Sequence, residues 1–219
     1  MKSAKYLVVE GPVGVGKTDL ARRLAHRLEG RAILEDSGDN PFLKLFYRNR
    51  TKYAFQAQVS FLLARYLKQT RLVHPDLFSK YLISDFLFGR GMIFARITLN
   101  MEELELYQKL VEQLAPKVPV PDLVVYLQAS TGALLDRINR FGRVFERDMD
   151  RMWLEDLVDS YNSWFLRDSN YPVLVVKSDS VDFLNDDFAF NGLVDAIEAH
   201  AGGIEGYNPS TEKDKGLLF

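Results

Sequence analysis

The stretch Val8-Val9-Glu10-Gly11-Pro12-Val13-Gly14-Val15-Gly16-Lys17-Thr18 decides the fold predicted for this chain. It fits the phosphate-binding loop pattern: a glycine, four residues, a second glycine, a lysine, and a serine or threonine. Glycines Gly11, Gly14 and Gly16 let backbone N–H groups surround phosphate oxygens. Lys17 supplies a positive charge, and the Thr18 hydroxyl can bind a magnesium ion. We therefore expect a nucleoside triphosphate and Mg²⁺ at this loop.

The flanking residues favour this interpretation over a chance glycine-rich turn. The motif requires a strand before it and a helix after it. Residues 6–9 are apolar and rich in valine, and residues 19–28 repeat apolar side chains at helical spacing. Both requirements are therefore met.

The composition is that of one α/β domain. The chain has 219 residues, a formal net charge of −2 and no cysteine. Such a charge provides no overall attraction to a nucleic acid polymer or an anionic membrane. The absence of cysteine rules out disulfides and thiolate chemistry, and no apolar run approaches the ~20 residues that span a bilayer. We expect a cytoplasmic protein.

Strands and helices alternate along the rest of the chain, which predicts an α/β fold with a five-stranded parallel sheet flanked by helices. We expect one domain over residues 1–201 and a flexible tail over residues 202–219. The strands after the first are predicted at residues 31–34, 81–84, 123–127 and 173–177, and the helices at residues 53–73, 101–114, 131–139, 152–166 and 193–200.

Two carboxylates directly follow predicted strands. Glu35 comes after the second strand and Asp85 after the third. Ligands of open α/β sheets bind where the carboxyl ends of the strands meet. We therefore expect both side chains near the phosphate-binding loop.

A short arginine-rich segment, residues 140–147, lies between two predicted helices. Planar guanidinium groups match phosphate geometry, so this segment is predicted to be a lid over a transferring phosphate. An Asn-Lys-x-Asp guanine signature is absent from the sequence, which argues against a GTPase. The combination predicts a kinase of the P-loop type.

Taken together, these motifs resemble the deoxyribonucleoside kinase family. The resemblance runs from about residue 5 to about residue 183. It rests on the loop, Glu35, the segments Asn40-Pro41-Phe42-Leu43 and Tyr53-Ala54-Phe55-Gln56-Ala57-Gln58, and the lid Arg137-Ile138-Asn139-Arg140-Phe141-Gly142-Arg143 with Glu146.

The resemblance implies a role for each matching residue. Glu35 would be the general base that accepts the proton of the nucleoside 5′-hydroxyl, with Lys17, Arg90 and Arg143 completing the catalytic set. The other implied roles are base binding by Gln58 and Arg65, sugar 3′-hydroxyl binding by Tyr47 and Glu146, donor-phosphate binding by Arg137 and Arg143, and Mg²⁺ binding by Thr18 and Asp85.

Two departures from the family pattern bear on selectivity. Asp85 is followed by Phe86, where much of the family has an arginine, and Arg90 is the nearest replacement. The family's base-contacting aspartate falls near Gly91, which predicts extra room beside the base. The string Ser84-Asp85-Phe86-Leu87-Phe88 resembles a bacterial branch that acts on purine deoxynucleosides, so we expect deoxyadenosine first and deoxyguanosine second.

The leading hypothesis is ATP-dependent phosphorylation of a deoxyribonucleoside in nucleotide salvage by a homodimer. A nucleoside monophosphate kinase of the thymidylate type is the first alternative, although it needs a second phosphate site. A nucleotide-binding regulatory protein without turnover is the second alternative.

Overall fold

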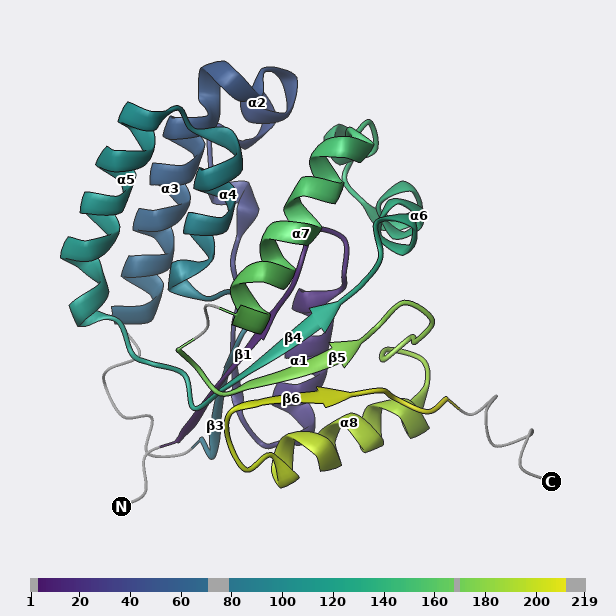
Figure 1. Cartoon of the computed structure of the whole chain (residues 1–219). Helices are drawn as coiled ribbons and strands as arrows, with labels where there is room; N and C mark the ends of the chain where they lie inside the picture. Colours follow the sequence, from purple (N-terminus) through teal and green to yellow (C-terminus); the bar gives the residue numbers. More distant parts are fainter. Residues whose placement is uncertain (1–3, 71–78, 168–169, 212–219) are drawn as a thin grey trace.

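The computed structural model describes residues 4–70, 79–167 and 170–211. Its core is a single parallel sheet with strand order β2-β3-β1-β4-β5-β6 (Figure 1). The α/β fold with a parallel sheet is therefore confirmed. The strands are β1 Lys5–Glu10, β2 Arg31–Ile33, β3 Tyr81–Ser84, β4 Leu123–Gln128, β5 Val173–Lys177 and β6 Ile204–Tyr207.

The central strands are apolar on both faces because helices cover both faces of a parallel sheet. Val8 and Val9 of β1 and Val124 and Val125 of β4 have no exposed surface. β1 lies between β3 and β4. The phosphate-binding loop therefore starts from the middle of the sheet, at the end of a strand that has a neighbour on both sides.

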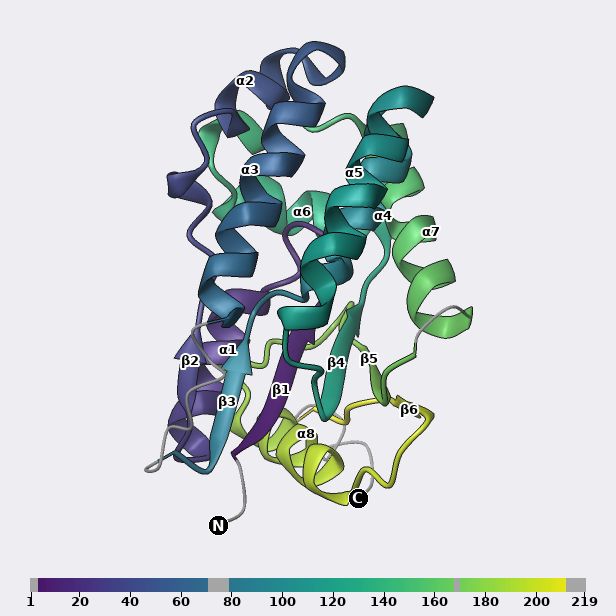
Figure 2. The same ribbon diagram turned by 90° about the vertical axis from the view of Figure 1, so that its left-hand side faces the viewer.

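Helices form a layer on each side of the sheet (Figures 1 and 2). α1 and α8 cover one face, while α3, α4 and α7 stand on the other, with α5 beside α3 and α4. α2 and α6 lie above the carboxyl edge of the strands. The helices are α1 Lys17–Arg27, α2 Leu43–Arg48, α3 Arg50–Thr70, α4 Gly91–Thr98, α5 Met101–Leu114, α6 Thr131–Phe141, α7 Arg151–Arg167 and α8 Asp187–Ala199.

The sheet has six strands, one more than the five predicted. The sixth strand, β6, lies within residues 202–219, which we expected to be a flexible tail. Gly202 and Gly203 both have positive φ, at 127° and 71°, and the chain turns back there to pair with β5. The four residues of β6 carry no distinctive pattern of their own, and the strand pairs with the edge of β5 that β4 does not occupy.

Most helix boundaries agree with the predictions to within a few residues, although α8 begins six residues earlier than the predicted 193. The predicted end of the long helix, at residues 71–73, and the final residues 212–219 lie outside the described part of the chain. Within the described residues, no helix combines the length and apolarity needed to cross a membrane.

Candidate active site

The phosphate-binding loop joins β1 to α1 at the carboxyl edge of the sheet. Gly11, Gly14 and Gly16 adopt positive φ, and a Cβ on Gly11 would lie 2.6 Å from the carbonyl oxygen of Leu127. Lys17 Nζ donates to the carbonyl oxygens of Gly11 and Pro12, at 2.7 and 2.8 Å. The loop is therefore a tight backbone turn with an ammonium group held across it.

Thr18 and Asp85 lie side by side next to this loop. The Thr18 hydroxyl donates to Asp85 Oδ2 at 2.5 Å, and the backbone N–H of Glu35 donates to Asp85 Oδ1 at 2.7 Å. Mg²⁺ in phosphoryl-transfer sites is bound by one or two carboxylates together with substrate phosphates. The paired oxygens of Thr18 and Asp85 are suited to such an ion.

The Glu35 carboxylate lies between two buried arginines. Arg65 Nε donates to Glu35 Oε1 at 2.6 Å, and Arg90 Nη1 donates to Glu35 Oε2 at 3.2 Å. Burial acts to raise the pKa of Glu35, but the two guanidinium groups outweigh it and lower the pKa to about 2. Glu35 is therefore ionised at neutral pH and fixed in orientation.

The surroundings of Lys17 disfavour its charged form, whereas those of Glu35 favour the charged form. Burial and the positive charge of Arg90 lower the pKa of Lys17 to about 8, against the attraction of Glu10, Asp85 and Glu35. A group with this pKa is close to its titration range at neutral pH. A bound phosphate would favour the charged form.

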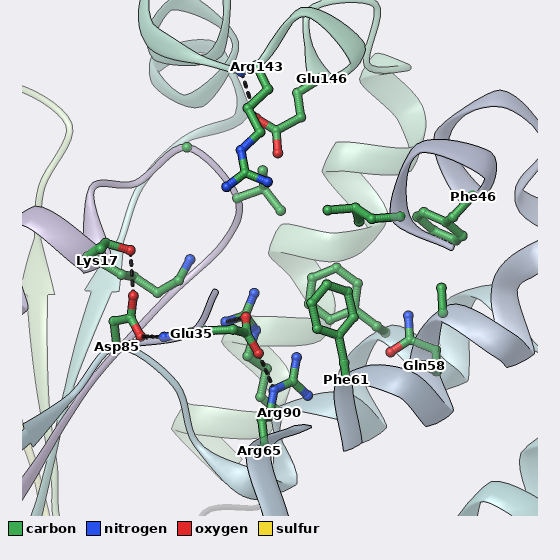
Figure 3. A pocket seen from close by; sticks show the side chains of 16 residues that line it. Lys17, Glu35, Phe46, Gln58, Phe61, Arg65, Asp85, Arg90, Arg143 and Glu146 are labelled. Carbon is green, nitrogen blue, oxygen red and sulfur yellow. Dashed lines mark hydrogen bonds and ion pairs between the residues drawn. The ribbon is translucent and has the colours of Figure 1, made fainter. Parts of the chain in front are cut away.

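A cavity of about 210 Å³ opens beside these groups. Lys17 and Asp85 lie on one side of it and Gln58 on the other, with Glu35 between them (Figure 3). Gln58 faces the cavity from α3, whereas its neighbour Gln56 is exposed to solvent. The apolar lining consists of Val13, Leu43, Phe46, Ala57, Phe61 and Phe94.

The structure contradicts the extra room predicted at Gly91. A Cβ at this position would lie 2.0 Å from the Tyr107 hydroxyl and 3.2 Å from Arg65 Nη1. Tyr107 belongs to α5 and is completely buried. A tyrosine from another helix therefore occupies the space that the small residue leaves, and Gly91 enlarges no base pocket.

The lid brings its arginines to a second, larger open cavity of about 1250 Å³. This cavity lies between the phosphate-binding loop, α6 and residues 178–185. Arg143 lines both cavities. Arg137 faces the second cavity, where its guanidinium donates to the carbonyl oxygens of Ser178 and Asp179.

The residues expected at the sugar come together where the lid meets α2. The rings of Tyr47 and Phe145 lie 5.3 Å apart, and Glu146 contributes to raising the pKa of Tyr47, although burial is the larger cause. Glu146 lines the smaller cavity and accepts a hydrogen bond from the backbone N–H of Arg143 at 3.0 Å.

Sequence reasoning missed two features of the site. Phe61 lies one helical turn after Gln58, so the 3.6-residue period of α3 could have placed it on the cavity wall. Glu10 follows four buried apolar residues of β1 and lies 4.0 Å from Arg90, and its charge at this position was the available signal. Several of the predicted site residues line one cavity, although more than fifty residues separate Glu35 from Arg90. They include Glu35, Gln58, Arg65, Asp85 and Arg90.

A phosphate-binding loop on a parallel sheet, carboxylates at its edge and an arginine-bearing lid define a phosphotransferase of the P-loop kinase class.

The sequence model described as deoxynucleoside kinase matches residues 7–201, and the chain belongs to this family. The deoxyguanosine kinase of Bacillus subtilis is 35% identical over 190 residues, covering 84% of this chain and 91% of the relative. The deoxyadenosine/deoxycytidine kinase of the same organism is 29% identical, over 87% of this chain and 90% of the relative.

A solved structure supports the same fold. The deoxyadenosine kinase of M. mycoides with bound dATP superposes with a TM-score of 0.76 at 19% identity, covering 89% of this chain and 100% of that chain. The protein is therefore a kinase with the deoxynucleoside kinase fold.

Proposed function

We propose that the protein transfers the γ-phosphoryl group of ATP, in the presence of Mg²⁺, to the 5′-hydroxyl of a purine deoxyribonucleoside in nucleotide salvage. The observation that carries this proposal is the placement of Glu35 in one cavity with Lys17 and Gln58. A nucleoside bound with its base at Gln58 has its 5′ end directed toward Glu35 and the phosphate-binding loop. The names of the Bacillus relatives support a deoxynucleoside substrate.

The two cavities suit two different ligands. The smaller one binds the nucleoside between its apolar walls, and the larger one binds the triphosphate along the loop amides with Arg137 and Arg143 beside it. Glu35 orients the attacking hydroxyl and accepts its proton, while Arg90 stays close to the transferring group. A magnesium ion at Thr18 and Asp85 would neutralise charge on the phosphates.

Tyr47 and Glu146 would hold the sugar 3′-hydroxyl. Glu146 lines the smaller cavity, whereas Tyr47 lies behind its lining, against Phe145 of the lid. The main partner of Arg65 is Glu35, since Arg65 Nε donates a hydrogen bond to that carboxylate. Its contact with the base is therefore confined to its remaining donors.

The thymidylate-kinase alternative needs cationic groups for an acceptor phosphate. Arg65 and Arg90 are the buried arginines on the acceptor side of the described cavity, and both are paired with Glu35. A nucleoside with an uncharged 5′-hydroxyl suits this arrangement better than a monophosphate. The family match also argues against a protein without turnover.

The proposed base preference rests on Gln58, because Tyr107 fills the space beside Gly91. A side-chain amide can accept from the adenine amine and donate to the ring nitrogen, and the flipped amide can pair with guanine. Deoxyadenosine, which the sequence resemblance favours, and deoxyguanosine, which is named for one Bacillus relative, are therefore the two substrates to compare.

Gln58→Ala should reduce kcat/KM by roughly ten- to a hundredfold on the preferred purine and by less on pyrimidine deoxynucleosides, because a buried hydrogen-bonding edge loses its partner. The measurement is kcat/KM for the four natural deoxynucleosides with ATP. Gln56→Ala is the matched control, since Gln56 is exposed on the same helix. A pyrimidine as the best substrate, or an unchanged ranking in Gln58→Ala, would contradict the purine assignment.

A homodimer is the association that the surface supports. Leu63 and Leu67 of α3 and Leu106 of α5 are about half exposed, and the two helices lie next to each other (Figure 2). A contiguous exposed apolar patch marks an association surface, and we propose that these three leucines belong to one. The double variant Leu63→Glu/Leu67→Glu should halve the mass measured by sedimentation, whereas Leu166→Glu on α7 should not. A monomeric wild-type protein would refute the dimer.

A further inference from the structure

Glu10 is a charged residue at a position that the strand pattern reserves for an apolar one. It ends β1, follows four buried apolar residues and has no exposed surface. An ionised carboxylate is costly to bury unless donors surround it. The contacts of the Glu10 carboxylate therefore indicate its role.

The carboxylate of Glu10 links three parts of the site. Its Oε2 accepts from the backbone N–H of Gly11 at 3.0 Å, which is the first amide of the phosphate-binding loop. Its Oε1 accepts from the backbone N–H of Leu87 at 2.8 Å, in the loop that follows β3. Arg90 Nε lies 4.0 Å from Oε1, and the Tyr161 hydroxyl lies 3.5 Å from Oε2.

Each of these four neighbours is a hydrogen-bond donor, so the site suits the ionised form. Burial is the largest effect and raises the pKa of Glu10 on balance, although Arg90, Lys17 and the two backbone N–H donors act against that shift. The ionised form is therefore assigned from the four donors around the carboxylate. A protonated carboxyl group would present a hydrogen to donors. Both oxygens therefore serve as acceptors, one toward the phosphate-binding loop and one toward the β3 loop.

Arg90 stands between Glu10 and Glu35. Its Nη1 donates to Glu35 Oε2 at 3.2 Å while its Nε faces Glu10. Burial acts to lower the pKa of Arg90, but Tyr161 and the carboxylates of Glu35, Glu10 and Asp85 outweigh it and raise the pKa. If the negative charge of Glu10 were removed, Arg90 would keep its hydrogen bond to Glu35 but would lose the carboxylate that its Nε faces.

We propose that Glu10 is a positioning residue, which holds Arg90 and the loop after β3 against the phosphate-binding loop so that Arg90 is correctly placed between Glu35 and the transferring phosphoryl group. Glu10 reaches no cavity surface and acts through Arg90. This inference rests on the role proposed above for Arg90.

The test is a double-mutant cycle between Glu10→Gln and Arg90→Gln, read as kcat for the preferred deoxynucleoside. Glutamine keeps the size of the side chain but replaces one acceptor with an NH₂ group that faces donors. We expect Glu10→Gln to lower kcat by about ten- to a hundredfold, the scale of a small misplacement at a reacting centre. In the Arg90→Gln background the same change should lower kcat by less than about twofold.

A structural role alone predicts something different. If Glu10 only stabilised the fold, Glu10→Gln would lower kcat by the same factor in both backgrounds, and this result would overturn the proposal. An unchanged kcat in Glu10→Gln would overturn it as well. Glu198→Gln, an exposed carboxylate on α8, is the matched control and should leave kcat unchanged.

Two further arms keep the outcomes distinct. Should Glu10→Gln fail to fold, Glu10→Asp replaces it in the same cycle, because aspartate keeps the charge but withdraws it from Arg90. If Arg90→Gln alone leaves kcat unchanged, the role proposed for Arg90 fails, and the inference falls with it. If Arg90→Gln is impaired and the two changes are additive, only the inference about Glu10 fails.

Discussion

Glu35→Gln is expected to lower kcat by about 10²- to 10⁴-fold while the Kd of the deoxynucleoside changes little. The amide cannot accept the hydroxyl proton, and it leaves two arginines without the carboxylate that each now contacts, at 2.6 and 3.2 Å. The measurement is steady-state turnover with ATP, together with nucleoside binding by calorimetry. Glu198→Gln is again the control, and near-normal turnover in Glu35→Gln would remove Glu35 from the mechanism.

The same variant has a pH signature in stability. The pKa of Glu35 is lowered from 4.5 to about 2 in the folded chain. The ionised carboxylate therefore stabilises the fold fully above its unfolded pKa, and this contribution is lost as the pH falls through about 2. The difference in Tm between wild type and Glu35→Gln should be largest near neutral pH and shrink as the pH is lowered toward 3.

Lys17→Ala is expected to lower kcat by about 10²- to 10³-fold, the scale of removing one group that stabilises charge in the transition state. The ammonium group lies across the phosphate-binding loop, 2.7 and 2.8 Å from two of its carbonyl oxygens, and is positioned to contact a bound triphosphate. Turnover with ATP checks this, and Lys80→Ala, an exposed lysine, should behave as wild type. Normal turnover in Lys17→Ala would refute the assignment of the loop.

Lys17 also predicts a basic limb in the pH profile. Because its pKa is about 8 in the unliganded chain, kcat/KM for ATP should fall as the pH rises through about 8, when the charged form is lost. In Lys17→Arg the guanidinium group stays charged to higher pH, so any remaining activity should decline at a higher pH than in the wild type. A limb that stays in place in Lys17→Arg belongs to another group.

Elements with local signals could be predicted from the amino-acid sequence alone. The loop motif between β1 and α1 could be predicted because its glycines adopt backbone conformations that other residues rarely adopt. Glu35 and Asp85 could be placed at one edge because the carboxyl ends of parallel strands coincide there. The helix predicted at residues 101–114 has these bounds in the structure, and Asn100 before it accepts from the backbone N–H of Glu103 in a capping box.

Other features depend on residues that are far apart in the chain. β6 pairs with the edge of β5 that β4 leaves free, and four residues without a clear pattern could not reveal that pairing. Gly91 looked like room for a base, yet Tyr107 from another helix fills the space. Periodicity describes which face of an element is buried, but not which side chain from a distant element occupies that face.

The electrostatics of the site also came only from the tertiary structure. A sequence marks Glu10, Glu35 and Arg90 as charged residues without saying that they meet. The fold places Arg90 3.2 Å from one carboxylate and 4.0 Å from the other, inside the protein. Because burial removes water, these distances strongly affect the protonation of the three groups. Distances between elements are set by packing rather than by local sequence.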